Sequence, residues 1–209
     1  MDRGNIVAVV AFVLIAIAIF ADGRYCWKAL THRIGPRLAT WLIFLVGSSL
    51  SLASYRAHVH VGTSFVSNIA NYIDATGLVL IVASVLISAR HEPERLRLKR
   101  FDWWCLAAAA AIVVLWVATG ANVAANLLLQ VLMCIGYSPT FKHLYQEKRN
   151  TEPFDSWIAN LCISTLSLIP PLLSRPCDWL GVVYAGRAVV CVVIILFAMR
   201  HYHHRGISS

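Results

Sequence analysis

Charged residues are scarce in this sequence: they make up 13% of its 209 residues, whereas 59% are hydrophobic. The mean hydropathy of +0.68 is too high for a soluble domain of this length. The shortage of charge therefore excludes an ordinary soluble domain and indicates an integral membrane protein with an all-α fold.

Closely spaced cysteines are also missing, because the six cysteines are scattered along the chain. They predict neither a disulfide framework nor a metal site. The eight histidines fall outside the apolar runs, in segments expected to be loops or tails, so a bundle of the apolar helices lacks paired haem ligands. No Ser-His or paired-carboxylate site is expected within the membrane. We therefore expect no enzyme, no catalytic residues, no metal and no cofactor.

Seven apolar runs are long enough to cross a hydrocarbon core of ~30 Å, which takes about 20 helical residues. The turn between the fourth and fifth runs is placed at Thr119-Gly120-Ala121, because one uninterrupted helix there would exceed the bilayer thickness. We predict seven transmembrane helices, roughly at residues 5–21, 37–55, 64–89, 103–119, 121–141, 156–174 and 179–199.

The 18 Lys and Arg residues are distributed by side of the predicted membrane. Three of them, Arg3, Arg56 and Arg175, fall in segments expected outside, and Arg187 falls within a helix. The remaining fourteen fall in segments expected inside. Cytoplasmic loops are enriched in Lys and Arg. We therefore predict an outside N-terminus and a cytoplasmic C-terminus in a bacterial inner (plasma) membrane, with the lipid bilayer as partner and no nucleic acid.

Two stretches of the chain repeat one plan. Trp41 is followed by Ser-Ser-Leu-Ser-Leu at residues 48–52, and Trp157, 116 residues later, is followed at the same spacing by Ser-Thr-Leu-Ser-Leu. This pattern predicts an internal duplication. We expect a three-helix unit at 1–91, a cytoplasmic linker with an inverting fourth helix at 92–119, and a second three-helix unit with a short C-terminal tail at 120–209.

The expected third helix carries the polar residues Asn71 and Asp74. A carboxylate near mid-membrane costs at least ~2.5 kcal/mol, so Asp74 is expected to face an interior or a water-filled cavity. When Tyr72 is matched to Tyr184 in the second unit, Asp74 falls within one residue of the position of Arg187. We predict that this acid and base face each other across the pseudo-symmetry axis. A structural ion pair without a ligand is the alternative.

Two further features concern the fifth and sixth helices. Asn122, Asn126 and Gln130 place amides four residues apart on one helical face, where they bind either a ligand or only the neighbouring helices. Pro139 and Pro170 are expected to interrupt their helices, because proline removes a backbone hydrogen-bond donor.

Three helices, an inverting helix and three further helices, with the N-terminus outside, resemble the MtN3, SWEET and PQ-loop transporter superfamily. The Pro-Gln pair that closes the first helix of each unit in that family stands here as Pro139-Thr140. The segment KRNTEPFDSWIAN, at residues 148–160, resembles the basic loop and Trp-Ile helix start of the PnuC vitamin transporters, which share a related fold.

The resemblance implies a small-molecule transporter that moves a polar or charged metabolite by alternating access, through a site between the third and seventh helices. The matching substrate-binding positions are Asn71, Asp74, Tyr184 and Arg187, with Asn160 and Trp157 nearby, and the candidate hinges are Pro139 and Pro170. The expected partner is a small-molecule substrate, and a homo-oligomer is left open. The competing hypothesis is a non-transporting membrane scaffold, assembly subunit or sensor of the same fold.

Overall fold

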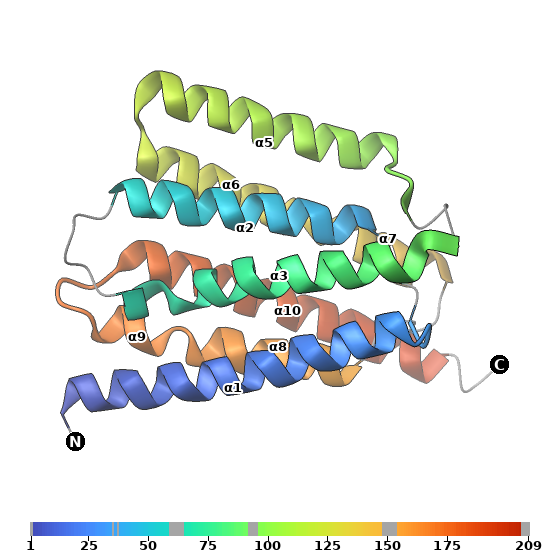
Figure 1. The fold of residues 1–209 in the computed structure, drawn as a ribbon, viewed down its shortest axis with the longest axis horizontal. Coiled ribbons are helices and arrows are strands. Elements are labelled where there is room, and N and C mark those ends of the chain that lie inside the picture. Colours follow the sequence, from blue (N-terminus) through green and yellow to red (C-terminus); the bar gives the residue numbers. More distant parts are fainter. Residues whose placement is uncertain are drawn as a thin grey trace.

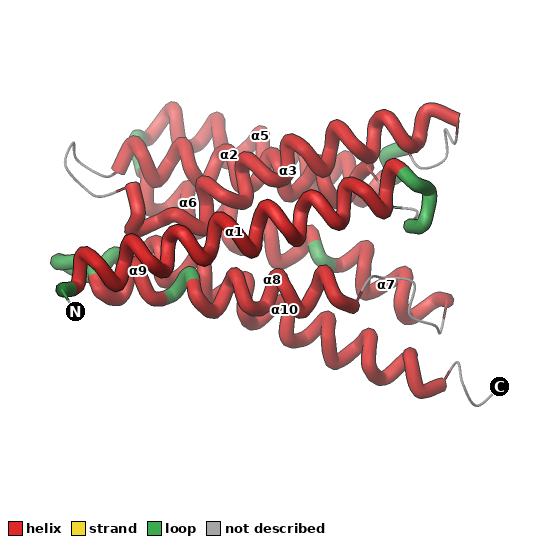
Figure 2. Tube along the Cα trace, turned by 60° about the horizontal axis from the view of Figure 1, so that its bottom comes forward, coloured by secondary structure: helices red, strands yellow, loops and turns green. Residues whose placement is uncertain are grey.

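The computed structural model describes residues 2–34, 36, 38–58, 65–91, 96–147 and 154–205. Within these ranges the chain forms nine α-helices and two short 3₁₀ helices, with no strand. The helices lie side by side along the long axis of the molecule and form one elongated bundle (Figure 1). Figure 2 shows the same bundle turned by 60°. The described residues thus have the all-α fold that the composition predicts.

Six segments are helical, long and apolar enough to cross a membrane. They are Arg3–Leu30 (α1), Leu38–His58 (α2), Val66–Ser88, Arg100–Thr119 (α5), Phe154–Leu173 and Trp179–His201. The third combines the 3₁₀ helix Phe65–Asn68 with α3 (Ile69–Ser88), the fifth combines α8 (Phe154–Leu166) with α9 (Ile169–Leu173), and the sixth lies within α10 (Trp179–Arg205). A second 3₁₀ helix, Ala89–His91, follows α3. The chain has the helices of a multi-pass membrane protein.

The remaining predicted span, residues 121–141, is divided in two. Helix α6 (Asn122–Gly136) has 15 residues, fewer than the roughly 20 that a full crossing takes, and α7 (Ser138–Glu147) follows it. Pro139 lies in the first turn of α7, where its missing backbone N–H would have no helical partner anyway. Pro170 lies likewise at the start of α9, just after α8 ends. Both expected interruptions are present, and the count of seven spans stays a prediction.

Helix α1 is longer than its apolar run. The sequence predicts an end near residue 21, but the helix continues to Leu30 and ends at a turn in which His32 takes the left-handed conformation, with φ of 54°. Gly23 alone does not stop it, since one helical glycine costs only about 1 kcal/mol. As a result, Arg24 and Lys28 lie on a helix rather than in a loop.

The helices pack in a regular pattern. Helix α3 lies against both α1 and α2, and α10 lies against both α8 and α6. Between these two groups α1 contacts α8 and α2 contacts α6, while α5 packs on α6 and α2. Two three-helix units, each with its third helix between the other two, would make these contacts. The duplication itself stays a prediction.

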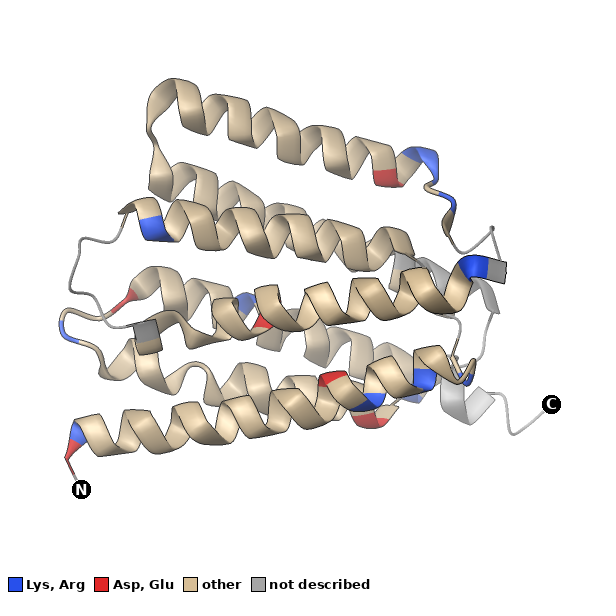
Figure 3. Cartoon of the chain, in the orientation of Figure 1, with Lys and Arg blue, Asp and Glu red and all other residues tan. Residues whose placement is uncertain are grey.

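Most charged residues lie toward the two ends of the bundle, and a few lie between the ends (Figure 3). The basic residues are concentrated at the end where α1, α3 and α10 finish and where α5 and α8 begin (Figure 3). The other end of the bundle carries Arg3 at the start of α1, Arg56 near the end of α2, and Arg175 in the connection between α9 and α10. This is the asymmetry on which the predicted orientation depends.

Candidate functional site

A cavity of about 110 Å³ lies within the bundle. Its wall takes side chains from α1, α2, α3, α6, α8 and α10, and therefore from both predicted units. A single water needs about 10–15 Å³ of such space, so the cavity has room for several waters or a small solute. Three of its lining residues carry charge, namely Asp22, Asp74 and Arg187, and most of the others are apolar or aromatic.

Most of the substrate-binding residues expected from the sequence lie in this wall. The five that line it are Asp74, Tyr184, Arg187, Asn160 and Trp157. Asn71 lies outside the wall: it is fully buried, and in either orientation its amide lies between Ser48 and Ser51 of α2. The structure thus brings five of the six together around one space, and their contact with a substrate stays a prediction.

Tyr184 connects the acid and the base of the cavity. Its hydroxyl donates to Asp74 Oδ2 over 2.7 Å, and the guanidinium carbon of Arg187 lies 5.1 Å from the centroid of its ring. Because Tyr184 and Arg187 are three residues apart on α10, both side chains reach the same face. Among the described residues no direct ion pair joins Asp74 and Arg187. The two charges share one cavity and are linked through the tyrosine.

Ser48 extends this chain of hydroxyls into α2. Its Oγ lies 3.1 Å from the Tyr184 hydroxyl. The Tyr184 hydroxyl already donates its hydrogen bond to Asp74, so Ser48 is the donor in the contact between Ser48 and Tyr184. This requires the Asn71 amide to turn its nitrogen toward Ser48, an orientation in which its oxygen also accepts from Ser51. The buried polar groups of α2, α3 and α10 therefore hold Tyr184 in place.

The amides of α6 bind neighbouring helices. Asn126 Nδ2 donates to the Ser51 carbonyl over 2.9 Å and to Ser54 Oγ over 3.1 Å, and Gln130 Nε2 donates to Ser51 Oγ over 2.9 Å. On its other side, Gln130 Oε1 accepts from Arg187 Nε at 2.9 Å. Of the two readings left open by the sequence, the structure therefore supports helix-to-helix contacts for Asn126 and Gln130, and Gln130 positions Arg187.

Asp22 is absent from the site residues expected from the sequence. It lies on α1, four residues after cavity-lining Ala18, and its carboxylate packs against Gly77, where an added Cβ would overlap it. Gly77 lies one turn after Asp74 on α3, and the two carboxylates are near enough for their charges to interact. The expectation that the bundle holds no pair of carboxylates is therefore wrong. The error follows from ending α1 too early, because a continued helix puts Asp22 on the face of Ala18.

Aromatic side chains form a continuous wall along the cavity. Ring centroids are 4.8 Å apart for Tyr25 and Trp41, 6.3 Å for Trp41 and Phe44, 4.6 Å for Phe44 and Tyr137, and 6.2 Å for Tyr137 and Trp157. Trp41 Nε1 also donates to the Tyr25 hydroxyl over 3.0 Å, which fixes the first pair. This aromatic wall, formed by the five residues Tyr25, Trp41, Phe44, Tyr137 and Trp157, presents ring surface to whatever occupies the cavity.

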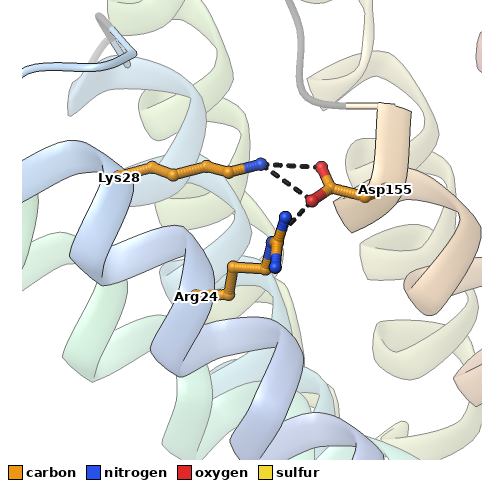
Figure 4. Close-up of polar contacts among 3 residues, drawn as sticks. All are labelled: Arg24, Lys28 and Asp155. Carbon is orange, nitrogen blue, oxygen red and sulfur yellow. Dashed lines mark hydrogen bonds and ion pairs between the residues drawn. The ribbon is translucent and has the colours of Figure 1, made fainter.

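An ion-pair cluster joins α1 to α8 beside the cavity (Figure 4). Asp155 accepts from Lys28 Nζ at 2.7 and 2.9 Å, and its Oδ2 lies 2.6 Å from Arg24 Nε. The side chains of Arg24, Lys28 and Asp155 are 50%, 19% and 42% exposed. Asp155 directly precedes Ser156, which lines the cavity. The cluster therefore ties the two predicted units together at the basic end of the bundle.

A second polar cluster joins helices at the opposite end. The Tyr55 hydroxyl of α2 donates to Asp178 Oδ2 over 2.5 Å and lies 2.9 Å from Ser67 Oγ. Asp178 in turn accepts from the Gly181 backbone N–H at 3.1 Å, at the start of α10. The absence of a side chain at Gly181 lets α10 approach Ser67 closely, since an added Cβ would lie 3.0 Å from the Ser67 carbonyl oxygen. Polar contacts thus join helices at both ends of the bundle.

Comparison of the chain with protein-family models, with curated proteins and with solved structures gives no match. The described residues also contain no group of three or more His, Cys, Asp or Glu side chains that could hold a metal ion. The case for a function therefore comes from the cavity and from the polar contacts that join helices at the two ends of the bundle.

Proposed function

We propose that this chain is a small-molecule membrane transporter of the SWEET, PQ-loop or PnuC kind. Its substrate is a polar or charged metabolite bound in the cavity between α3 and α10. The observation that carries the proposal is the cavity itself, which places Asp22, Asp74 and Arg187 inside a bundle of apolar helices. Ionisable groups inside a membrane are costly and mark substrate or ion pathways by default.

The state of Arg187 supports a binding role for the cavity. Its Nη1 is buried and has no hydrogen-bond partner in the described part of the chain. An unpaired buried donor on a charged group carries a desolvation penalty of roughly 1–3 kcal/mol or more. A polar acceptor brought next to Nη1 when the cavity opens would relieve this penalty.

The two polar clusters supply the gates that alternating access needs. The Asp155 cluster joins α1 to α8, and the Tyr55 cluster joins α2 to the start of α10. Breaking one cluster while the other holds opens the cavity to one side only, as when two units rock around a fixed site. The interruptions at Pro139 and Pro170 are the proposed hinges. With the N-terminus outside, the Asp155 cluster is the cytoplasmic gate of a protein in the plasma membrane.

The proposal is tested by ligand-dependent thermal unfolding of the purified protein. The panel contains sugars, nucleosides, vitamins, amino acids and amines. A ligand that binds only the folded state adds about 2.7 kcal/mol at 100 times its Kd. We expect at least one compound to raise the melting temperature of the wild-type protein.

The matched variants are Ala188→Phe and Val190→Phe. Ala188 lines the cavity and is 7% exposed, whereas Val190 on the same helix is 58% exposed. Phenylalanine at 188 fills the cavity, so the ligand-induced shift should disappear there and persist in Val190→Phe. A shift that survives in both variants contradicts a site in the cavity. A broad panel without any shift favours the scaffold or sensor hypothesis.

A further inference from the structure

Asp22 is the one lining carboxylate whose role the contacts leave unexplained. Asp74 accepts a hydrogen bond from Tyr184, and Asp155 outside the cavity is paired with two cations. In the described part of the chain, no hydrogen bond or ion pair involves the Asp22 carboxylate. Asp22 nevertheless lies in the cavity wall, against Gly77 and near Asp74. An unpaired carboxylate inside a membrane bundle is costly, so a positive partner is to be expected there.

The net charge of the cavity wall indicates the sign and magnitude of the charge on that partner. Its charged lining residues are Asp22, Asp74 and Arg187, so with all three ionised the described wall carries a net charge of −1. Arg187 donates to Gln130 and lies over the Tyr184 ring, and among the described residues no ion pair joins it to Asp22. A single positive charge brought in by a solute balances the wall.

The aromatic wall gives the chemistry of the partner. Tyr25 lies three residues after Asp22 on α1, so its ring and the free carboxylate reach the same part of the cavity. Aromatic faces attract cations within about 6 Å of the ring centroid, most strongly where water is excluded. Aromatic faces also pack against the hydrocarbon part of a ligand, and a bare metal ion has no such part. Carboxylates beside a run of rings therefore favour an organic cation over an inorganic one.

We propose that the cavity selects a small organic monocation, with its ammonium group between Asp22 and Asp74 and its hydrocarbon part against the aromatic wall. This inference depends on the proposed transport function, because it names the substrate class of the same cavity.

The first test compares two probes of the same shape and different charge, and it needs no variant. Choline and its neutral isostere 3,3-dimethylbutan-1-ol are titrated into the wild-type protein in lipid nanodiscs by calorimetry, with sodium chloride as the ionic control. We expect choline to bind at least about tenfold more tightly than the neutral isostere, because only choline carries a charge that the carboxylates and the aromatic faces attract. Equal binding of the two probes overturns the proposal. Competition by sodium ions at the concentration of choline overturns the organic part of it.

The second test removes the carboxylates one at a time. Asp22→Asn and Asp74→Asn should each weaken choline binding by about tenfold or more, because each removes a negative charge that attracts the ammonium group. Asp2→Asn, which removes the same charge at an exposed position with no side-chain capping bond, should leave binding unchanged. Undiminished choline binding by a folded, monodisperse Asp22→Asn protein overturns the proposal.

The failure of this inference is distinguishable from failure of transport. If a sugar or an anion binds the wild-type protein and this binding is lost only in Ala188→Phe, the proposal of an organic cation is overturned and the transporter proposal stays intact. Binding of no compound of any charge contradicts transport itself, and the assignment of a cation fails with it.

Discussion

The ion-pair cluster between α1 and α8 offers the sharpest prediction about gating. Asp155→Asn removes the negative charge that Lys28 and Arg24 share. Exposed ion pairs contribute roughly 0.2–1 kcal/mol each, so the two pairs together contribute about 0.4–2 kcal/mol. If that energy holds the cytoplasmic end closed, its loss raises the equilibrium constant for opening by about 2- to 30-fold, because 1.4 kcal/mol corresponds to a factor of ten.

Opening at this end is measured by labelling a cavity cysteine. Asn160→Cys, in a background without the six native cysteines, reports access to the cavity from the cytoplasmic side. Inside-out vesicles are treated with a membrane-impermeant maleimide, and the labelling rate is proportional to the open fraction. We expect the rate to rise by the factor above in Asp155→Asn and to stay at the reference value in Asp2→Asn.

A charge exchange checks that the effect comes from the ion pair. In the double variant Lys28→Asp with Asp155→Lys, opposite charges again face each other across α1 and α8, so the labelling rate should return toward the reference. An unchanged rate in Asp155→Asn would refute the gating role, and so would an exchanged pair that labels as fast as the single variant.

Two further substitutions probe the cavity and its outer closure. Gly77→Ala places a Cβ where the Asp22 carboxylate now lies, so it should weaken the binding of cavity ligands measured by thermal shift. Gly186→Ala is the control, because its added Cβ meets nothing within 4 Å and should leave this binding unchanged. Equal binding by the two variants contradicts the placement of Asp22. Tyr55→Phe removes the hydrogen bond to Asp178 and should cost roughly 1–3 kcal/mol of stability, seen as a lower melting temperature of the purified protein. An unchanged melting temperature contradicts the closure of that end.

The membrane class and the interruptions of the helices can be predicted because each depends on local chemistry. Hydropathy over about 20 residues identifies spans whatever the packing of the helices. Pro139 and Pro170 act through their own missing N–H groups, so their effect is also local. The end of α1 is misplaced by the sequence because composition marks only where apolar sequence stops. A helix continues until a breaker or cap ends it, here in the turn at His32.

The candidate site can be predicted in part. Depth in the membrane and polarity are enough to single out Asp74, Tyr184 and Arg187, which the structure brings to one cavity. Asn71 has the same signature but turns toward α2, because the serines of that helix offer hydrogen-bond partners. Asp22 escapes prediction since its place depends on the length of α1 and on the space left by Gly77. Both the turn of Asn71 and the place of Asp22 are set by the packing of helices, which no local pattern encodes.

The measurement that bears most directly on transport is an uptake assay in proteoliposomes that works with an unidentified substrate. Vesicles containing the wild-type protein, Ala188→Phe or Val190→Phe, and vesicles without protein, are incubated with a mixture of small metabolites, and their contents are identified by mass spectrometry. We predict that at least one solute enters the wild-type and Val190→Phe vesicles and is excluded from the Ala188→Phe and empty vesicles. Identical contents in all four preparations would contradict transport through the cavity.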